Sequence, residues 1–114
     1  MPTTNLNMNI REVSDGVRVI DVVGEITAFS EQQISEAHEE AGEGATAVIL
    51  NFDGLEYMNS GGIGLLVTTL IRAQRAGHDL RAYGLTDHYR EIFSLTRLDE
   101  AIVIYEDEAS AVVG

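Results

Sequence analysis

The residues with the greatest capacity for chemistry lie close together, where Asn59 and Ser60 are followed by Gly61, Gly62 and Gly64. A strongly apolar segment precedes them and a long run with helical periodicity follows, so we expect them to form the start of a helix. The first turn of a helix has backbone N–H groups without intrahelical partners and carries a partial positive charge. A serine beside glycines at such a position is a candidate site for a phosphate group or for a docking protein.

The rest of the chain offers no second group of residues that would complete a catalytic or metal site. His38, His78 and His88 lack the spacing of metal ligands, and we expect all three on the surface. The glycines of Gly61–Gly64 lack the lysine of a P-loop and the spacing of a dinucleotide fingerprint, and no Gly-x-Ser-x-Gly motif occurs. Cysteine is absent. We therefore predict a protein that is not an enzyme, with no catalytic residue, no metal and no cofactor.

The charge of the chain excludes several classes of partner. Nineteen acidic residues against seven basic ones give a formal net charge of −12. Nucleic acids and anionic membranes are bound through lysine and arginine, so we exclude both as direct partners. The apolar run Ile63–Ile71 is interrupted by Thr68 and Thr69 and is far shorter than the roughly 20 residues that span a bilayer. Met1–Asn9 has no signal-peptide pattern. We expect a cytoplasmic protein without direct membrane insertion.

The elements that position the candidate site follow from hydrophobic periodicity. Alternating apolar residues over Leu6–Ile10, a turn at Ser14–Gly16 and an apolar run over Val17–Val23 predict an opening hairpin. Ala47–Phe52 is typical of a strand that is covered on both faces. The remaining expected segments are a loop over Asp53–Ser60, a helix over Gly61–Ala76, a strand over Leu80–Leu85, a helix from a cap at Asp87 to Leu95, a strand over Ala101–Tyr105 and a helix over Glu108–Val113.

A further helix is expected after the hairpin. Ser30 is a suitable N-cap with Gln33 reaching back to it, and Phe29 is placed to pack on Ile34. Gly42 and Gly44 end this helix. The order ββαβαβαβα predicts a single α/β domain over residues 1–114, with a mostly parallel sheet that opens with a β-hairpin and has helices packed against it.

The segment Tyr57-Met58-Asn59-Ser60-Gly61-Gly62-Ile63-Gly64, reached from the strand Val48–Phe52, resembles the STAS domain family of bacterial anti-sigma factor antagonists. The likeness covers nearly the whole chain. It implies a STAS-like fold and a regulator that binds an anti-sigma factor, typically a serine kinase with a histidine-kinase-like ATPase fold, and so frees a sigma factor. It also implies a switch, in which phosphorylation at the start of the second helix ends binding and a phosphatase restores it.

The chain departs from the family pattern at the switch itself. The family loop usually reads Asp/Asn-Ser-Ser/Thr-Gly-Leu/Ile-Gly, and the second hydroxyl residue accepts the phosphate. Asn59 and Ser60 match the first two positions, but the acceptor position is Gly61, which has no hydroxyl. The acidic residue that many members carry after Gly-Glu-Ile is Thr27 here. The resemblance therefore implies a partner-binding surface of Thr27, Tyr57, Met58, Asn59, Ser60, Gly61 and Gly62.

Three roles are open for Ser60: a helix cap, a phosphorylation site one residue earlier than usual, or a partner contact. The helical glycines each cost about 1 kcal/mol relative to alanine, so we expect a compensating close approach. For Gly62 the approaching backbone is either this domain's own or the partner's; for Gly64 we expect packing within the domain. The alternative function is a STAS-like adaptor subunit of a lipid or solute ABC transporter, in which no phosphorylation occurs.

Overall fold

The computed structural model describes residues 5–114, so the first four residues of the predicted domain lie outside the described part. Within the described residues, five strands form one sheet in the order β1-β2-β3-β4-β5. β1 is antiparallel to β2, and the other neighbouring strands are parallel. This confirms the predicted α/β fold class with its opening hairpin. The elements are β1 (Leu6–Ser14), β2 (Val17–Ile26), the 3₁₀ turn η1 (Ala28–Ser30), α1 (Glu31–Gly42), β3 (Ala47–Met58), α2 (Ser60–Arg75), β4 (Asp79–Tyr83), α3 (Asp87–Leu95), α4 (Leu98–Ala101), β5 (Val103–Tyr105) and α5 (Glu108–Val113).

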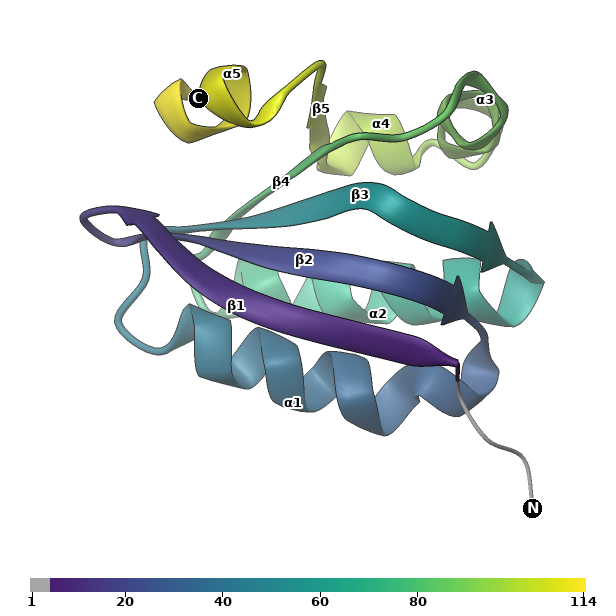
Figure 1. The fold of residues 1–114 in the computed structure, drawn as a ribbon, viewed down its shortest axis with the longest axis horizontal. Helices are drawn as coiled ribbons and strands as arrows, with labels where there is room; N and C mark the ends of the chain where they lie inside the picture. Colours follow the sequence, from purple (N-terminus) through teal and green to yellow (C-terminus); the bar gives the residue numbers. More distant parts are fainter. Residues whose placement is uncertain (1–4) are drawn as a thin grey trace.

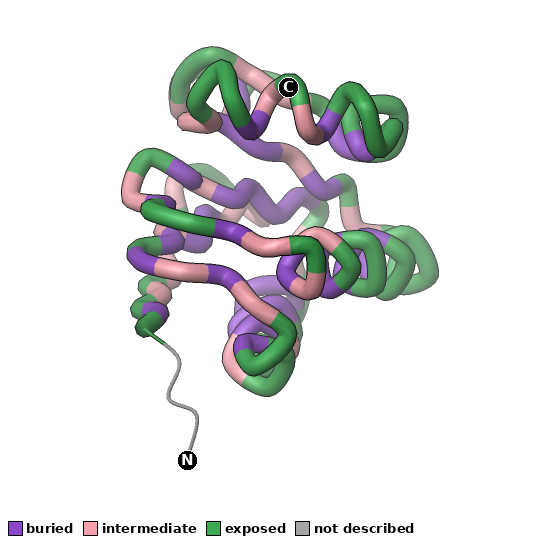
Figure 2. The backbone as a smooth tube through the Cα atoms, turned by 90° about the vertical axis from the view of Figure 1, so that its right-hand side faces the viewer, coloured by how far each residue is buried: buried purple, intermediate pink, exposed green. Residues whose placement is uncertain are grey.

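The helices are divided between the two faces of the sheet. α1 and α2 lie side by side along one face, and α5 lies on the opposite side (Figure 1). The larger core cluster joins the strands to α1, α2, α3 and α4, and a smaller cluster, which includes Val19, Ile49, Tyr83 and Ala111, lies under α5. Buried residues lie along the strands and on the sides of the helices that face the sheet, and exposed residues lie on the sides of the helices that face solvent (Figure 2). Consecutive parallel strands with right-handed crossovers place successive helices on one face.

The third strand is longer than the sequence predicts. β3 continues through the segment Asp53–Met58, which we expected to be a loop, and pairs there with the end of β2. The Asp-Gly pair suggests a turn, but the ladder between β2 and β3 shifts register here. An added Cβ on Gly54 would lie 3.0 Å from the carbonyl oxygen of Val22 and 2.8 Å from a methyl of Val23. Gly54 therefore permits close approach at an irregular ladder rather than a turn.

Three smaller expectations about helices are also wrong. Thr86, and not Asp87, caps α3, because its side chain accepts from the backbone N–H of Tyr89. The short α4 forms where the sequence predicts no helix and includes Ala101, the first residue of the predicted last strand, which is reduced to Val103–Tyr105. Packing of Phe29 on Ile34 is not observed, since Phe29 is 65% exposed.

Candidate functional site

The start of the first helix is organised by Thr27 rather than by Ser30. Thr27 Oγ1 accepts from the backbone N–H of Phe29 at 3.2 Å, and Ser30 Oγ accepts from the backbone N–H of Thr27 at 3.0 Å. These reciprocal bonds form a capping box around η1. Ser30 makes no side-chain cap bond to α1, and Gln33 donates instead to the carbonyl of Leu6. The connection from β2 to α1 is thus fixed, with Thr27 half-buried in it.

The start of α2 is capped by Asn59, so of the three roles open for Ser60 the helix cap is wrong. Asn59 Oδ1 accepts from the backbone N–H of Gly62 at 2.9 Å, and the Asn59 backbone is extended, as an N-cap requires. The Asn59 N–H in turn donates to the carbonyl of Ile26 at the end of β2. Ser60 becomes the first residue of α2 and is exposed. Its hydroxyl is available for modification or for contact with another molecule.

The three glycines of this turn differ in what surrounds them. An added Cβ on Gly62 would lie 2.4 Å from the carbonyl oxygen of Ile26, so the close approach at Gly62 is to the domain's own strand. A Cβ on Gly61 would lie 2.9 Å from the Cβ of Ala28 in η1. Gly64 is exposed and has nothing within 4 Å of an added Cβ, so the packing expected for it is wrong.

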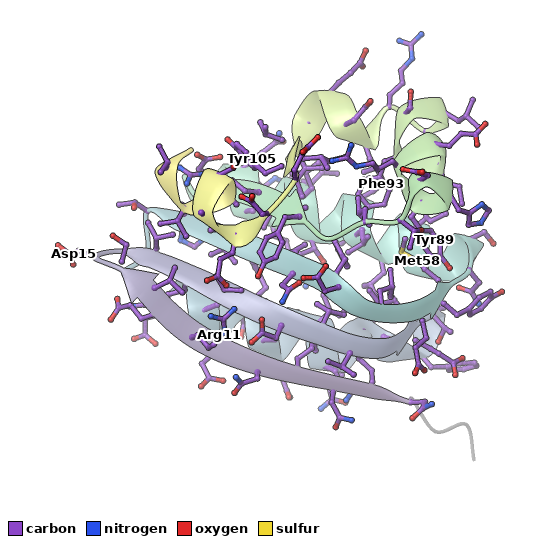
Figure 3. The ribbon with its side chains drawn as sticks, turned by 45° about the horizontal axis from the view of Figure 1, so that its top comes forward. Arg11, Asp15, Met58, Tyr89, Phe93 and Tyr105 are labelled. Atoms are coloured by element: carbon purple, nitrogen blue, oxygen red, sulfur yellow. The ribbon has the colours of Figure 1, made fainter. Side chains whose placement is uncertain are left out.

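Met58 and Tyr57, neighbours at the end of β3, have opposite environments. Tyr57 is 50% exposed, whereas Met58 is 4% exposed. The Met58 backbone N–H donates to the buried hydroxyl of Tyr89 at 2.8 Å. Figure 3 shows Met58 beside Tyr89 and Phe93, between β3 and α3. The Met58 side chain and Gly62 are both buried in this structure, and their role as partner contacts stays a prediction.

The exposed residues Phe29, Tyr57 and Ser60, with the half-buried Thr27 and Gly61, form one surface around this turn, which we call the tip surface. Pairing of Tyr57 with Glu25 and the contact between Gly61 and Ala28 bring the end of β3, η1 and the start of α2 together. Phe29 was not among the predicted partner-binding residues. An aromatic residue between the end of a strand and a helix is equally compatible with packing inward, so only the structure distinguishes the two.

A cluster of charged and polar side chains lies on the face of the sheet opposite α1 and α2, beneath α5. Arg11 holds Asp21 through bonds of 2.7 and 2.9 Å and Glu108 at 2.5 Å, so that it links β1, β2 and the first turn of α5. Asn51 donates to Asp21 at 2.8 Å and Tyr83 donates to Glu108 at 2.9 Å. The guanidinium lowers the pKa of both carboxyls, and burial, followed by Glu108, raises the pKa of Tyr83 to about 12. The cluster anchors α5 to the sheet; Figure 3 labels Arg11 within it.

Two of the three histidines are not on the surface. His38 is buried on the inner side of α1, and its ring lies 5.7 Å from that of the half-buried His78 in an edge-to-face arrangement. His38 Nε2 and His78 Nδ1 are buried without a hydrogen-bond partner. Burial, followed by the charges of His78 and Arg72, lowers the pKa of His38. Only His88 is exposed as expected.

Residues 5–114 lack two features that would point to other functions. No group of three or more histidine, cysteine, aspartate or glutamate side chains is arranged to hold a metal ion within that range. None of the helices described there is both long and apolar enough to cross a membrane.

Comparison with known proteins gives consistent matches over nearly the whole chain. The STAS domain model matches residues 9–111. The anti-sigma-B factor antagonist of Listeria monocytogenes is 31% identical over 104 residues, which cover 88% of this chain and 89% of that protein. An anti-sigma factor antagonist from Mycobacterium paratuberculosis superimposes with a TM-score of 0.77 at 21% identity, covering 96% and 92% of the two chains. A sulfate transporter family protein from Wolinella succinogenes gives a TM-score of 0.75 at 14% identity, covering 90% and 88%. The two structural likenesses show a shared fold alone.

Proposed function

This chain belongs to the STAS domain family, and from that premise we propose that it is an anti-sigma factor antagonist: it binds an anti-sigma factor through the tip surface and so frees a sigma factor. The Listeria relative bears that name and aligns over almost its full length. The transporter-adaptor alternative has weaker support, because the transporter family protein shares the fold at only 14% identity. A sigma regulator acts in the cytoplasm, where we place this protein.

The observation that carries the proposal is the exposure of two aromatic side chains beside the start of α2. Phe29, which lies in η1 just after β2, is 65% exposed, and Tyr57, which lies near the end of β3, is 50% exposed. Aromatic residues are enriched among those that dominate binding energy, because they bury much area with little loss of conformational freedom. Ser60, the exposed first residue of α2, adds a hydroxyl at the positively polarised start of the helix. The tip surface thus offers apolar area together with polar groups that fix orientation.

We further propose that Ser60 is the phosphorylation site, in place of the missing hydroxyl at Gly61. Ser60 is exposed, and its hydroxyl is not needed for the cap, which Asn59 supplies. A phosphate adds about −1.5 to −2 charges to the tip surface of a protein that already carries −12. Desolvating that charge in an interface opposes binding. The kinase is then the anti-sigma factor itself, with a histidine-kinase-like ATPase fold, and a phosphatase reverses the reaction.

The function is tested by competition for a sigma factor. A complex of an anti-sigma factor and its sigma factor, both from the genome that encodes this chain, is titrated with the purified chain. Release of the sigma factor, followed by fluorescence anisotropy of a labelled sigma factor, supports the proposal. No release by the folded chain with any such pair would contradict it.

The phosphorylation site is tested separately by intact mass after incubation with ATP and the anti-sigma factor. A gain of one phosphate that disappears in Ser60→Ala supports Ser60 as the acceptor. A gain that persists in this variant assigns the modification to another residue. Absence of any gain leaves an antagonist that binds without this switch and overturns the role of Ser60.

A further inference from the structure

Two histidines meet where α1 and α2 end, away from the tip surface. Within residues 5–114, two buried side-chain polar atoms have no hydrogen-bond partner, and they are His38 Nε2 and His78 Nδ1. Buried polar atoms are nearly always paired, because an unpaired one loses its hydration without compensation. Both exceptions belong to neighbouring imidazoles, so a single ligand can satisfy the two nitrogens together.

The end of α2 fixes the backbone of His78. The N–H of Gly77, a residue at positive φ, donates to the carbonyl of Gln74 at 3.1 Å. The N–H of His78 donates to the carbonyl of Ala73 at 2.9 Å. These two bonds form a Schellman motif, which ends the helix and leads the chain into β4. The position of the His78 imidazole is therefore set by backbone hydrogen bonds.

The ring of His78 packs against the last turn of α1. A Cβ added to Gly42 would lie 2.5 Å from Cε1 of His78 and 2.9 Å from its Nδ1. A side chain at position 42 would therefore displace this ring. His38 precedes Gly42 by four residues, so the two positions share one side of the helix. The unpaired nitrogen of His78 thus faces the side of α1 that carries His38.

The two imidazoles line one groove and lie close together. His38 is 6% exposed, and its ring centroid lies 5.7 Å from that of the half-buried His78, with an angle of 68° between the ring planes. The groove has a volume of about 390 Å³. The fold thus brings together two ligand-type side chains from α1 and from the segment between α2 and β4.

The separation of the rings fits a metal ion that both imidazoles share. Zn²⁺ binds imidazole nitrogens at about 2.0–2.1 Å, which places the ion about 3.2 Å from the centroid of each ring. The two centroids are then about 5.2 Å apart at the tetrahedral angle and about 6.4 Å apart when the three points lie on a line. The observed 5.7 Å lies between these values. The separation therefore allows both rings to coordinate one ion.

The charges around the pair favour a cation. α1 and α2 lie side by side (Figure 1), and the last turn of each lines the groove. The carboxyl end of a helix carries a partial negative charge. Glu39 and Glu43 line the groove as well, and so does Arg72, whose guanidinium donates to the hydroxyl of Ser35 at 2.5 Å. With both histidines neutral, the side chains of the groove carry two negative charges against one positive charge.

We propose that His38 and His78 bind a divalent transition-metal ion of the Zn²⁺ type, with water or a carboxylate of the groove completing the coordination. Imidazole nitrogens are common ligands of such ions, which accept mixed nitrogen and oxygen coordination. The ion links the last turn of α1 to the segment before β4 and so stabilises the folded state. Because the groove and the tip surface lie at opposite ends of α1 and α2, this site is independent of the proposed function.

Calorimetric titration with Zn²⁺ tests the site on the purified chain without a histidine tag. We expect one ion per chain, and at least tenfold weaker binding in His38→Gln and in His78→Gln. His88→Gln is the matched control, because His88 is exposed on α3, and it is expected to bind as the unmodified chain does. Mg²⁺, which prefers oxygen ligands, should not compete. Thermal unfolding in EDTA shows which variants are folded.

Nuclear magnetic resonance of the imidazole nitrogens gives a readout that needs no variant. Zn²⁺ should shift the nitrogen resonances of His38 and His78 and leave those of His88 unchanged. Shifts confined to His88 or to one member of the pair, or equal Zn²⁺ affinity in folded His38→Gln and His78→Gln, indicate an adventitious ion only and overturn the proposal. A folded chain that takes up no Zn²⁺ overturns it as well.

Discussion

Two glycines two residues apart in α2 are expected to respond to alanine in opposite directions. In Gly62→Ala the new Cβ meets the carbonyl oxygen of Ile26 at 2.4 Å, about 1 Å closer than an ordinary contact. The obstructing atom belongs to the backbone and cannot rotate away as a side chain would. The same Ile26 carbonyl accepts from the Asn59 N–H, so either β2 or the start of α2 must move. Overpacking of this kind costs about 1–3 kcal/mol, which exceeds the gain in helix propensity of at most about 1 kcal/mol. We expect a net loss of up to about 2 kcal/mol.

Gly64→Ala supplies the matched control, because its new Cβ meets nothing within 4 Å. Only the propensity gain remains, so we expect stabilisation of up to about 1 kcal/mol. The propensity gain is common to both variants, so their free energies of unfolding differ by the overpacking cost of about 1–3 kcal/mol. At about 4 °C per kcal/mol for a domain of this size, their melting temperatures should differ by about 4–12 °C. Urea denaturation followed by circular dichroism gives the free energies directly. A Gly62→Ala variant as stable as Gly64→Ala would refute the internal close approach at Gly62.

Further predictions concern groups buried away from the tip surface. Tyr89→Phe removes the hydroxyl that accepts from the buried N–H of Met58, and should lower the free energy of unfolding by about 1–3 kcal/mol in urea denaturation; an unchanged value would exclude this bond. Burial beside His78 lowers the pKa of His38, so neutral His38 is favoured in the folded state. Its contribution to stability is present above the ordinary pKa of about 6.5 and is lost as the pH falls below it. Unfolding free energies at pH 7.5 and 5.0 should therefore differ less in His38→Leu than in the unmodified chain, and an equal difference would contradict this assignment.

Most of the fold could be predicted from the sequence, because hydrophobic alternation and helical periodicity are local signals. The hairpin of β1 and β2 and the long α2 follow directly from them. The extension of β3 does not, since Asp53-Gly54 is a turn signal in isolation, and only pairing with β2 shows that Gly54 serves an irregular ladder. His38 was predictable: it follows the apolar Ile34 by four residues and so shares the buried stripe of α1.

The candidate site could be located from the sequence but not resolved into roles. Asn59 and Ser60 are both good N-caps, and the choice of Asn59 depends on where β3 ends. Which of Tyr57 and Met58 points inward depends on the strand register, and that register is shifted by irregularities of the β2–β3 ladder. Likewise, Gly62 and Gly64 cannot be distinguished without the position of Ile26.

The central claim is that the tip surface binds an anti-sigma factor, and the most direct measurement is the dissociation constant of that complex for Phe29→Ala and Tyr57→Ala. Leu95→Ala is the matched control, since Leu95 is 76% exposed on α3. If the aromatic residues anchor the interface, each substitution should weaken binding by roughly 30-fold, equivalent to about 2 kcal/mol, while Leu95→Ala binds as tightly as the unmodified chain. Unchanged affinity in both aromatic variants, with their folds intact, would contradict the account.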